Sequence, residues 1–234
     1  MASLLARCSI PALLGALLLA TNVRAGELTT LETRWLEGLW PVIRYAKETR
    51  LPLDVIVQPQ EAPDAAPLAL GFVDGRCKLV LSMRGNPEAE ATLDRIAPDL
   101  VDSALELMAA HELGHCRRYL DGTWFGGRAG FMGAEPTGPD AELRAEYRTM
   151  RAVRREEGYA DLVGLGWVRE HHPDEYQRLH AWLVDERSRD LVPGSQHDTL
   201  AWLRLAGDGD ALADASIFVA ADRLWRAGLA VDGE

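Results

Sequence analysis

The sequence lacks the features of a nucleic-acid-binding or membrane-embedded protein. Its 234 residues include 36 acidic and 25 basic side chains, a formal net charge of −11 at pH 7, and they contain no basic patch. Such a surface repels nucleic acid and anionic membranes, so we exclude DNA and RNA as partners. After residue 25 there is no apolar run of the roughly 20 residues that a membrane-spanning helix needs. There is also no internal repeat and no low-complexity tract.

The first 25 residues have the pattern of a secretory signal peptide. Arg7 supplies a positive charge before the apolar run Ile10 to Ala20, and Val23-Arg24-Ala25 fits the small-x-small pattern of a cleavage site. We therefore expect a mature protein that starts at Gly26 and is periplasmic or secreted. Removal of two arginines and no acid changes the net charge from −11 to −13. An uncleaved signal anchor is the alternative.

Cysteine is scarce, and its placement predicts one disulfide bond. Cys8 lies in the signal peptide, so the mature chain keeps only Cys77 and Cys116. Two cysteines in an oxidising compartment favour a disulfide. Closing a loop of that length contributes roughly 4 kcal/mol to the free energy of unfolding in the chain-entropy model. Two buried free thiols are the alternative.

Apolar periodicity predicts a small sheet followed by helices. Leu68–Val73 and Cys77–Met83 are two apolar runs separated by Asp74-Gly75-Arg76, which is a hairpin signal. We expect a further strand at Leu53–Gln58 and a helix at 28–50 that is kinked at Pro41. A second helix should begin at Asp99 or Asp102 as N-cap and end at about residue 121. Further helices are expected at 140–170, 174–189, 199–205 and 211–229. Residues 122–139 hold six Gly and two Pro and predict a long loop. The expected fold class is α+β: one domain over 26–234, with a small N-terminal antiparallel sheet and a mostly helical body.

The strongest chemical signal is His-Glu-Leu-Gly-His at residues 111 to 115. On a helix, residues i and i+4 share one face, so His111 and His115 can direct both imidazoles at one metal ion. Glu112 is then placed to act as general base on a water activated by zinc. The pattern predicts a Zn²⁺ site with hydrolytic chemistry. Two histidines on a solvated helix face are the alternative.

A catalytic zinc needs a third protein ligand, and the best candidate is Glu157. Glu157 and Asp161 are again i and i+4 on a predicted helix, where two like charges are mildly destabilising, so we expect a positive group near them. Zinc bound by Glu157, with Asp161 accepting the ring N–H of a liganding histidine, satisfies both carboxylates. Glu156 is the main substitute as ligand. An acidic face balanced by the arginines at 151, 154 and 155 is the alternative.

These motifs resemble those of the gluzincin metallopeptidases. His-Glu-Leu-Gly-His followed after 42 residues by Glu-Gly-Tyr-Ala-Asp is similar to the prenyl-protein and HtpX-type endopeptidase branch, and less similar to thermolysin. The resemblance covers residues 109–161. It implies a zincin-like fold, the ligands His111, His115 and Glu157, the base Glu112, and Asp161 as partner of a ligand. Those membrane enzymes have transmembrane helices, which this sequence lacks after its signal, so the substrate class does not carry over.

Asp121 and His197 are two further candidates for the site. In the metzincin pattern Asp121 falls at the third ligand position, but Arg118 replaces the glycine at which that helix must turn, so Asp121 should point away from the metal. His197 lies in a polar turn before an apolar helix, where it either stabilises an oxyanion, oriented by Asp198, or is solvated. The remaining histidines at 171, 172 and 180 are expected to be solvated.

The sequence therefore predicts a zinc peptidase or amidase that acts on a peptide or protein substrate. By analogy with zincins, the strand Cys77–Met83 is the expected edge on which an extended peptide would lie. The alternative from another class is a non-catalytic envelope protein that uses zinc for structure or for partner binding.

Overall fold

The computed structural model describes residues 27–60, 62–63, 65–122, 141–189, 191–213 and 216–232. The predicted signal peptide and nearly all of the glycine-rich segment lie outside these residues. The helices are α1 (Thr30–Glu48), α2 (Pro87–Asp94), α3 (Val101–Leu120), α4 (Ala141–His171), α5 (Tyr176–Ser188), α6 (Leu200–Leu205) and α7 (Ile217–Val231), and the strands are β1 (Leu53–Pro59), β2 (Leu68–Val73) and β3 (Arg76–Arg84). The protein is mostly helical with one small sheet, as predicted, and α1 precedes the sheet as the expected helix at 28–50.

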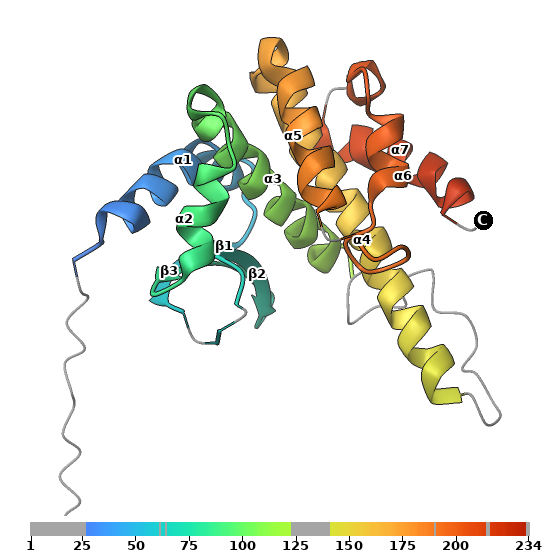
Figure 1. Cartoon of the computed structure of the whole chain (residues 1–234), viewed down its shortest axis with the longest axis horizontal. Helices are drawn as coiled ribbons and strands as arrows, with labels where there is room; N and C mark the ends of the chain where they lie inside the picture. The colour runs from blue at the N-terminus through green and yellow to red at the C-terminus, as the bar shows by residue number, and fades with distance from the viewer. Residues whose placement is uncertain are drawn as a thin grey trace, which may run out of the picture.

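Helices α3 and α4 form the centre of the molecule. The sheet, α1 and α2 lie on the α3 side, and α5, α6 and α7 lie on the α4 side (Figure 1). Small residues allow α3 and α4 to approach closely, because a Cβ atom added at Gly114 would be 2.9 Å from the Cα atom of Ala160 and one at Gly164 would be 2.9 Å from the carbonyl oxygen of Leu107. Gly158 allows a close contact with another helix, because a Cβ atom added there would be 2.5 Å from the Trp202 ring of α6.

Helix α1 forms where its local signals place it. The Thr29 side chain accepts a hydrogen bond from the backbone N–H of Glu32, and the Glu32 carboxylate accepts one from the N–H of Thr29, which is a complete capping box. Its apolar face, with Trp35 and Leu39, is buried in the core. Pro41 lies inside the helix.

The sheet is mixed, so the predicted antiparallel sheet was correct only for the hairpin. β2 pairs antiparallel with β3, but β1 pairs parallel with β3, and the strand order is β1-β3-β2. The hairpin turn has positive φ at Asp74 (52°) and at Gly75 (74°), as a two-residue type I′ turn requires. β3 is the central strand, hydrogen-bonded to β2 on one side and to β1 on the other. Its buried side chains Cys77, Leu79, Leu81 and Met83 alternate along the strand and therefore lie on one face of the sheet, against the core.

This order also corrects the expected peptide-binding edge. The strand containing Cys77–Met83 is β3, which has a hydrogen-bonded neighbour on each side. A central strand has no free backbone groups for an added strand, whereas β1 and β2, the two outer strands, each have one side without a strand partner among the described residues. The sequence assigned this role to β3, and the structure gives it to the two outer strands.

The ends of several helices differ from the predictions. α3 begins at Val101 after a short 3₁₀ helix, η1 (Pro98–Leu100), and neither Asp99 nor Asp102 caps it, since these carboxylates pair with Arg178 and Arg34. The 3₁₀ helices η2 (Pro173–Glu175) and η3 (Asp210–Leu212) precede α5 and α7. α2 was not predicted as a separate helix, although Asn86 as N-cap and Pro87 in the first turn signal it. In the part of the chain that the structure describes, no helix is both long and apolar enough to cross a bilayer.

Candidate metal centre

Helices α3 and α4 bring His111, His115 and Glu157 together. The Nε2 atoms of the two histidines are 3.1 Å apart. The Glu157 carboxylate lies with Oε1 3.3 Å from Nε2 of His115 and with Oε2 3.5 Å from Nε2 of His111. All three side chains are largely buried, with 10–13% of each exposed. Three potential ligand atoms therefore converge on one point.

The separations of these atoms fit a tetrahedral zinc ion. Ligand atoms about 2.0–2.1 Å from a tetrahedral zinc are about 3.3–3.4 Å from one another, and the observed separations are 3.1, 3.3 and 3.5 Å. Two imidazoles and a carboxylate are also a donor set that zinc prefers. The residues present fit the metal that the sequence predicts, and its binding remains a prediction.

Asp161 orients the first histidine. Its Oδ1 is 2.9 Å from Nδ1 of His111, so the ring carries its proton on Nδ1 and presents the Nε2 lone pair to the other ligand atoms. Asp161 is fully buried and also accepts hydrogen bonds from Arg187 and from the hydroxyl of Thr199 (2.6 Å). Burial alone would raise the pKa of Asp161, but the Arg187 charge and the His111 hydrogen bond hold it well below its usual range. Asp161 is therefore ionised.

Arg187 of α5 is a site residue that sequence reasoning missed. It donates to Asp161 at 2.6 and 2.9 Å and lies 3.4 Å from Oε2 of Glu157. The two like charges of Glu157 and Asp161 indicated that a positive group should lie near them, and we predicted from the sequence that this group is zinc. The sequence could not select Arg187, because it lies 26 residues after Asp161 on another helix.

The arginines considered as an alternative balance another acid. Arg154 and Arg155 pair with Asp232 at the end of α7 (both 2.7 Å), and Arg151 lies 3.6 Å from the same carboxylate. The alternative in which these three arginines balance Glu157 and Asp161 was therefore wrong.

The competing ligands lie elsewhere. Glu156 forms a buried ion pair with Arg118, with two hydrogen bonds of 2.6 and 2.7 Å. Asp121 follows the end of α3, is exposed, and pairs with Arg117 at 3.0 Å. Neither carboxylate reaches the histidines, so Glu157 is the carboxylate that joins the group. The metzincin arrangement is not formed.

A cleft of about 480 Å³ opens beside this group. Its lining combines the three possible ligands with Glu112, apolar side chains and part of β2, and includes Leu68, Ala69, Leu70, Leu107, Met108, Trp35 and Trp182. Glu112 is 9% exposed. Burial raises the pKa of Glu112, while the charges of the two histidines act in the opposite direction. A carboxylate that faces a cleft beside two imidazoles is placed to exchange protons there.

His197 lines the same cleft from the loop before α6. Its Nδ1 is 3.8 Å from Oε2 of Glu157 and 3.3 Å from the Arg187 guanidinium. The side chain is 55% exposed, and burial of the rest lowers its pKa. The expectation that Asp198 orients this ring was wrong, because Asp198 accepts the backbone N–H of Gly194.

The other histidines lie away from the site, and none is simply solvated. His171 stacks on Trp167, with ring centroids 3.7 Å apart, and its Nδ1 is 3.1 Å from the Trp167 carbonyl oxygen. His172 is 2.9 Å from the Glu106 carboxylate, and His180 is 2.8 Å from the carbonyl oxygen of Leu203. Sequence reasoning expected all three histidines in water. The sequence positions of His172 and His180 did not reveal their partners, because Glu106 lies on α3 and Leu203 on α6.

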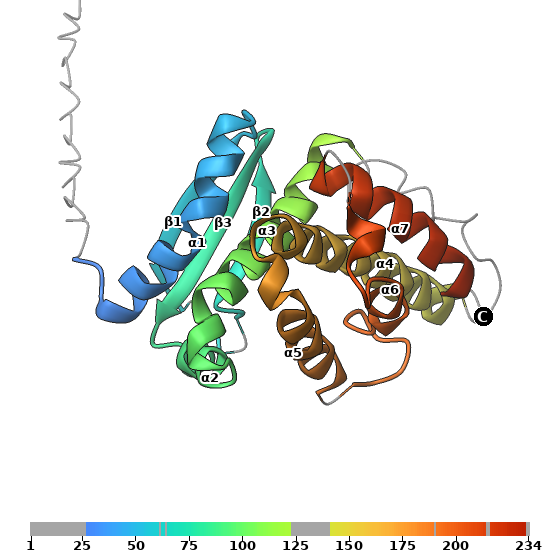
Figure 2. The same ribbon diagram turned by 90° about the horizontal axis from the view of Figure 1, so that it is seen from above.

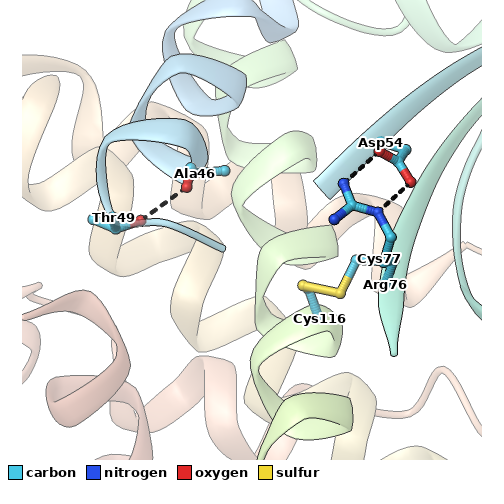
Figure 3. Close-up of a disulfide and its surroundings, with 6 residues drawn as sticks. All are labelled: Ala46, Thr49, Asp54, Arg76, Cys77 and Cys116. Carbon is cyan, nitrogen blue, oxygen red and sulfur yellow. Dashed lines mark hydrogen bonds and ion pairs between the residues drawn. A yellow bond between two sulfur atoms is a disulfide. The ribbon is translucent and has the colours of Figure 1, made fainter. Parts of the chain in front are cut away.

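The predicted disulfide between Cys77 and Cys116 is present, with a Cα–Cα separation of 5.6 Å (Figure 3). It joins the start of β3 to the residue that follows His115, and both cysteines are fully buried. Near it, Phe72 of β2 stacks on Tyr119, with the ring centroids 4.9 Å apart. The final turns of α3 are therefore attached to the sheet beside the histidines.

Comparison with known proteins identifies no relative. No family model, curated protein or solved structure matches the chain.

Proposed function

We propose that the protein is a zinc-dependent hydrolase of peptide-type bonds, gluzincin-like in its site, that acts in the periplasm or outside the cell. The observation that carries the proposal is the convergence of His111, His115 and Glu157 at tetrahedral separations on the wall of a cleft. The disulfide supports an oxidising compartment.

The shape of the group favours catalysis over a structural role. A structural zinc is closed by four protein ligands, whereas a catalytic zinc keeps a position for substrate or water. Within the described residues, the group of candidate ligands has three members. The fourth direction is available to the cleft that these residues line.

In the proposed reaction, zinc supplies Lewis acidity that polarises the substrate carbonyl and makes water more acidic. Glu112 accepts the proton of the attacking water and returns it to the leaving amine. The C–N bond breaks, the acyl carbon keeps the hydroxyl, and the amine leaves with the proton. His197 donates a hydrogen bond to the oxyanion from the loop before α6. Asp161 and Arg187 hold His111 and Glu157 in place.

We propose that the substrate backbone lies along the unpaired edge of β2. Of the two outer strands, β2 is the one that lines the cleft, through Leu68, Ala69 and Leu70, and one of its sides has no strand partner in the part of the chain that the structure describes. An extended peptide can add there by main-chain hydrogen bonds, most favourably antiparallel to β2.

Replacement of the base tests the proposal. Glu112→Gln should keep zinc, measured by metal analysis, and should lose hydrolysis of periplasmic proteins, measured as new N-termini produced by wild-type protein but not by the variant. His115→Ala is the matched control that should lose both zinc and hydrolysis. A Glu112→Gln protein with wild-type turnover would refute the assignment.

A further inference from the structure

An ion pair joins the two walls of the cleft. Arg95, at the C-cap of α2, donates from Nε to both carboxylate oxygens of Glu186 on α5, at 3.1 and 3.2 Å. Both residues line the cleft that contains the candidate ligands. They are 91 residues apart in the sequence, and the helices that carry them lie at the same end of the molecule (Figure 2).

The pair is held in place by further contacts. The Arg95 guanidinium also donates to Glu88 (2.6 Å) and to the hydroxyl of Thr92 (3.2 Å), and Glu186 also accepts from Arg189 (2.9 Å). The Arg95 and Glu186 side chains are only 24% and 19% exposed. The positive charges of Arg95 and Arg189 balance the negative charges of Glu88 and Glu186. The bridge therefore carries no net charge, and further contacts hold each of its two members.

The bridge stands at one definite end of β2. β3 leads directly into α2 and then into α3, while the disulfide ties the far end of α3 back to the start of β3. α3 therefore runs antiparallel to β3 and parallel to β2. The start of β2 lies beside the end of β3, where the N–H of Ser82 bonds to the carbonyl of Pro67. α2 and Arg95 thus lie at the start of β2.

This position sets which part of a substrate meets the bridge. A peptide antiparallel to β2 has its C-terminal side at the start of that strand. The Tyr119–Phe72 stack places the end of α3 near the end of β2. His115 and His111 lie about 6 and 12 Å earlier along the helix, which at about 3.3 Å per strand residue is level with Leu70 and with Leu68. From Leu70, the farther of these two levels, to Pro67 the distance is about 10 Å at 3.3 Å per residue, which holds about three substrate residues.

We propose that the Arg95–Glu186 bridge ends the cleft on the C-terminal side of the scissile bond, so that the enzyme removes short peptides from the carboxyl ends of its substrates. The inference rests on the proposed function. The substrate class is then a peptide with about three residues or fewer after the cleaved bond, and longer extensions are excluded by the bridge.

Cleavage of a peptide library tests this inference. Zinc-loaded protein is incubated with a mixed library of peptides about 12 to 15 residues long, and mass spectrometry records how far each cleaved bond lies from the carboxyl end. The variant is Arg95→Ala with Glu186→Ala. The matched control is Arg178→Ala with Asp99→Ala, which removes a second ion pair between α5 and η1 (2.7 Å) that does not line the cleft. Thermal unfolding verifies that both variants are folded.

Wild-type and control proteins should cleave within three residues of the carboxyl end about tenfold more often than elsewhere, and the bridge variant should lose at least four-fifths of that preference. Cleavage spread evenly along the peptides by wild-type protein would overturn the inference and leave the proposed function intact. So would a preference that persists in the folded bridge variant. If wild-type protein produces no cleavage that Glu112→Gln protein lacks, the proposed function fails, and the inference fails with it.

Discussion

Removal of the Cys77–Cys116 bond should destabilise the fold far more than it changes the candidate metal centre. The bond closes a loop with a sequence separation of 39 residues. In the chain-entropy model this constraint contributes about 4 kcal/mol at 25 °C. Replacement of both cysteines by alanine should therefore lower the free energy of unfolding by about that amount. For a chain of this size the melting temperature should fall by roughly 8–16 °C.

Zinc affinity should respond less. Gly114, one residue before His115, is held against Ala160 of α4 whether or not the sulfurs are joined, and Asp161 orients His111 from the same helix. We expect less than a tenfold loss of zinc affinity in chelator competition at a temperature where the variant is folded.

Urea unfolding and metal titration measure the two effects on the same samples. Wild-type protein unfolded in the presence of a reductant is the control, and it should match the double variant in its free energy of unfolding. A loss of stability below about 1 kcal/mol would refute the loop-closure reasoning. A hundredfold loss of zinc affinity in the folded variant would show that the bond, and not the packing of α3 on α4, holds the histidines.

Two other substitutions probe single contacts. Arg187→Gln should weaken zinc binding by about 10–100-fold in chelator competition, because partners of metal ligands contribute at this level; Arg189→Gln, on an exposed neighbour, should change it by less than twofold. Glu32→Gln keeps a capping side chain but removes a buried charge that pairs with Arg84 at 2.8 Å, and it should cost about 1 kcal/mol at pH 7.

The effect of Glu32→Gln should depend on pH. Burial alone would raise the pKa of Glu32, but the hydrogen bonds from Arg84 and Thr29 lower it below its usual value. A lowered pKa stabilises the folded state above the unfolded value of about 4.3, and this contribution is lost as the pH falls through the folded value. Urea unfolding of wild type and variant should therefore differ at pH 7 and converge below about pH 4. A difference in the free energy of unfolding that stays constant across this pH range would contradict the charge argument for Glu32.

For Arg187→Gln, an unchanged zinc affinity would refute the role of Arg187 in positioning the metal ligands.

Local features of this protein were predictable from the sequence because their causes are local. The capping box at Thr29 and Glu32 and the type I′ turn at Asp74 and Gly75 depend on residues within three positions of one another. The same holds for His111 and His115, which share a helix face because of the helical repeat. The disulfide was predictable for another reason, since only two cysteines lie outside the predicted signal peptide.

The tertiary structure alone decided which of these residues act together. β3 became the central strand because β1, which β2 separates from it in the sequence, pairs parallel to it, a long-range pairing that no hairpin signal contains. Glu157 joined the histidines while Glu156 paired with Arg118, since residues next to each other on a helix point in directions about 100° apart. Arg187 and the Arg95–Glu186 bridge depend on how α5 packs, and packing brings together residues that the sequence keeps far apart.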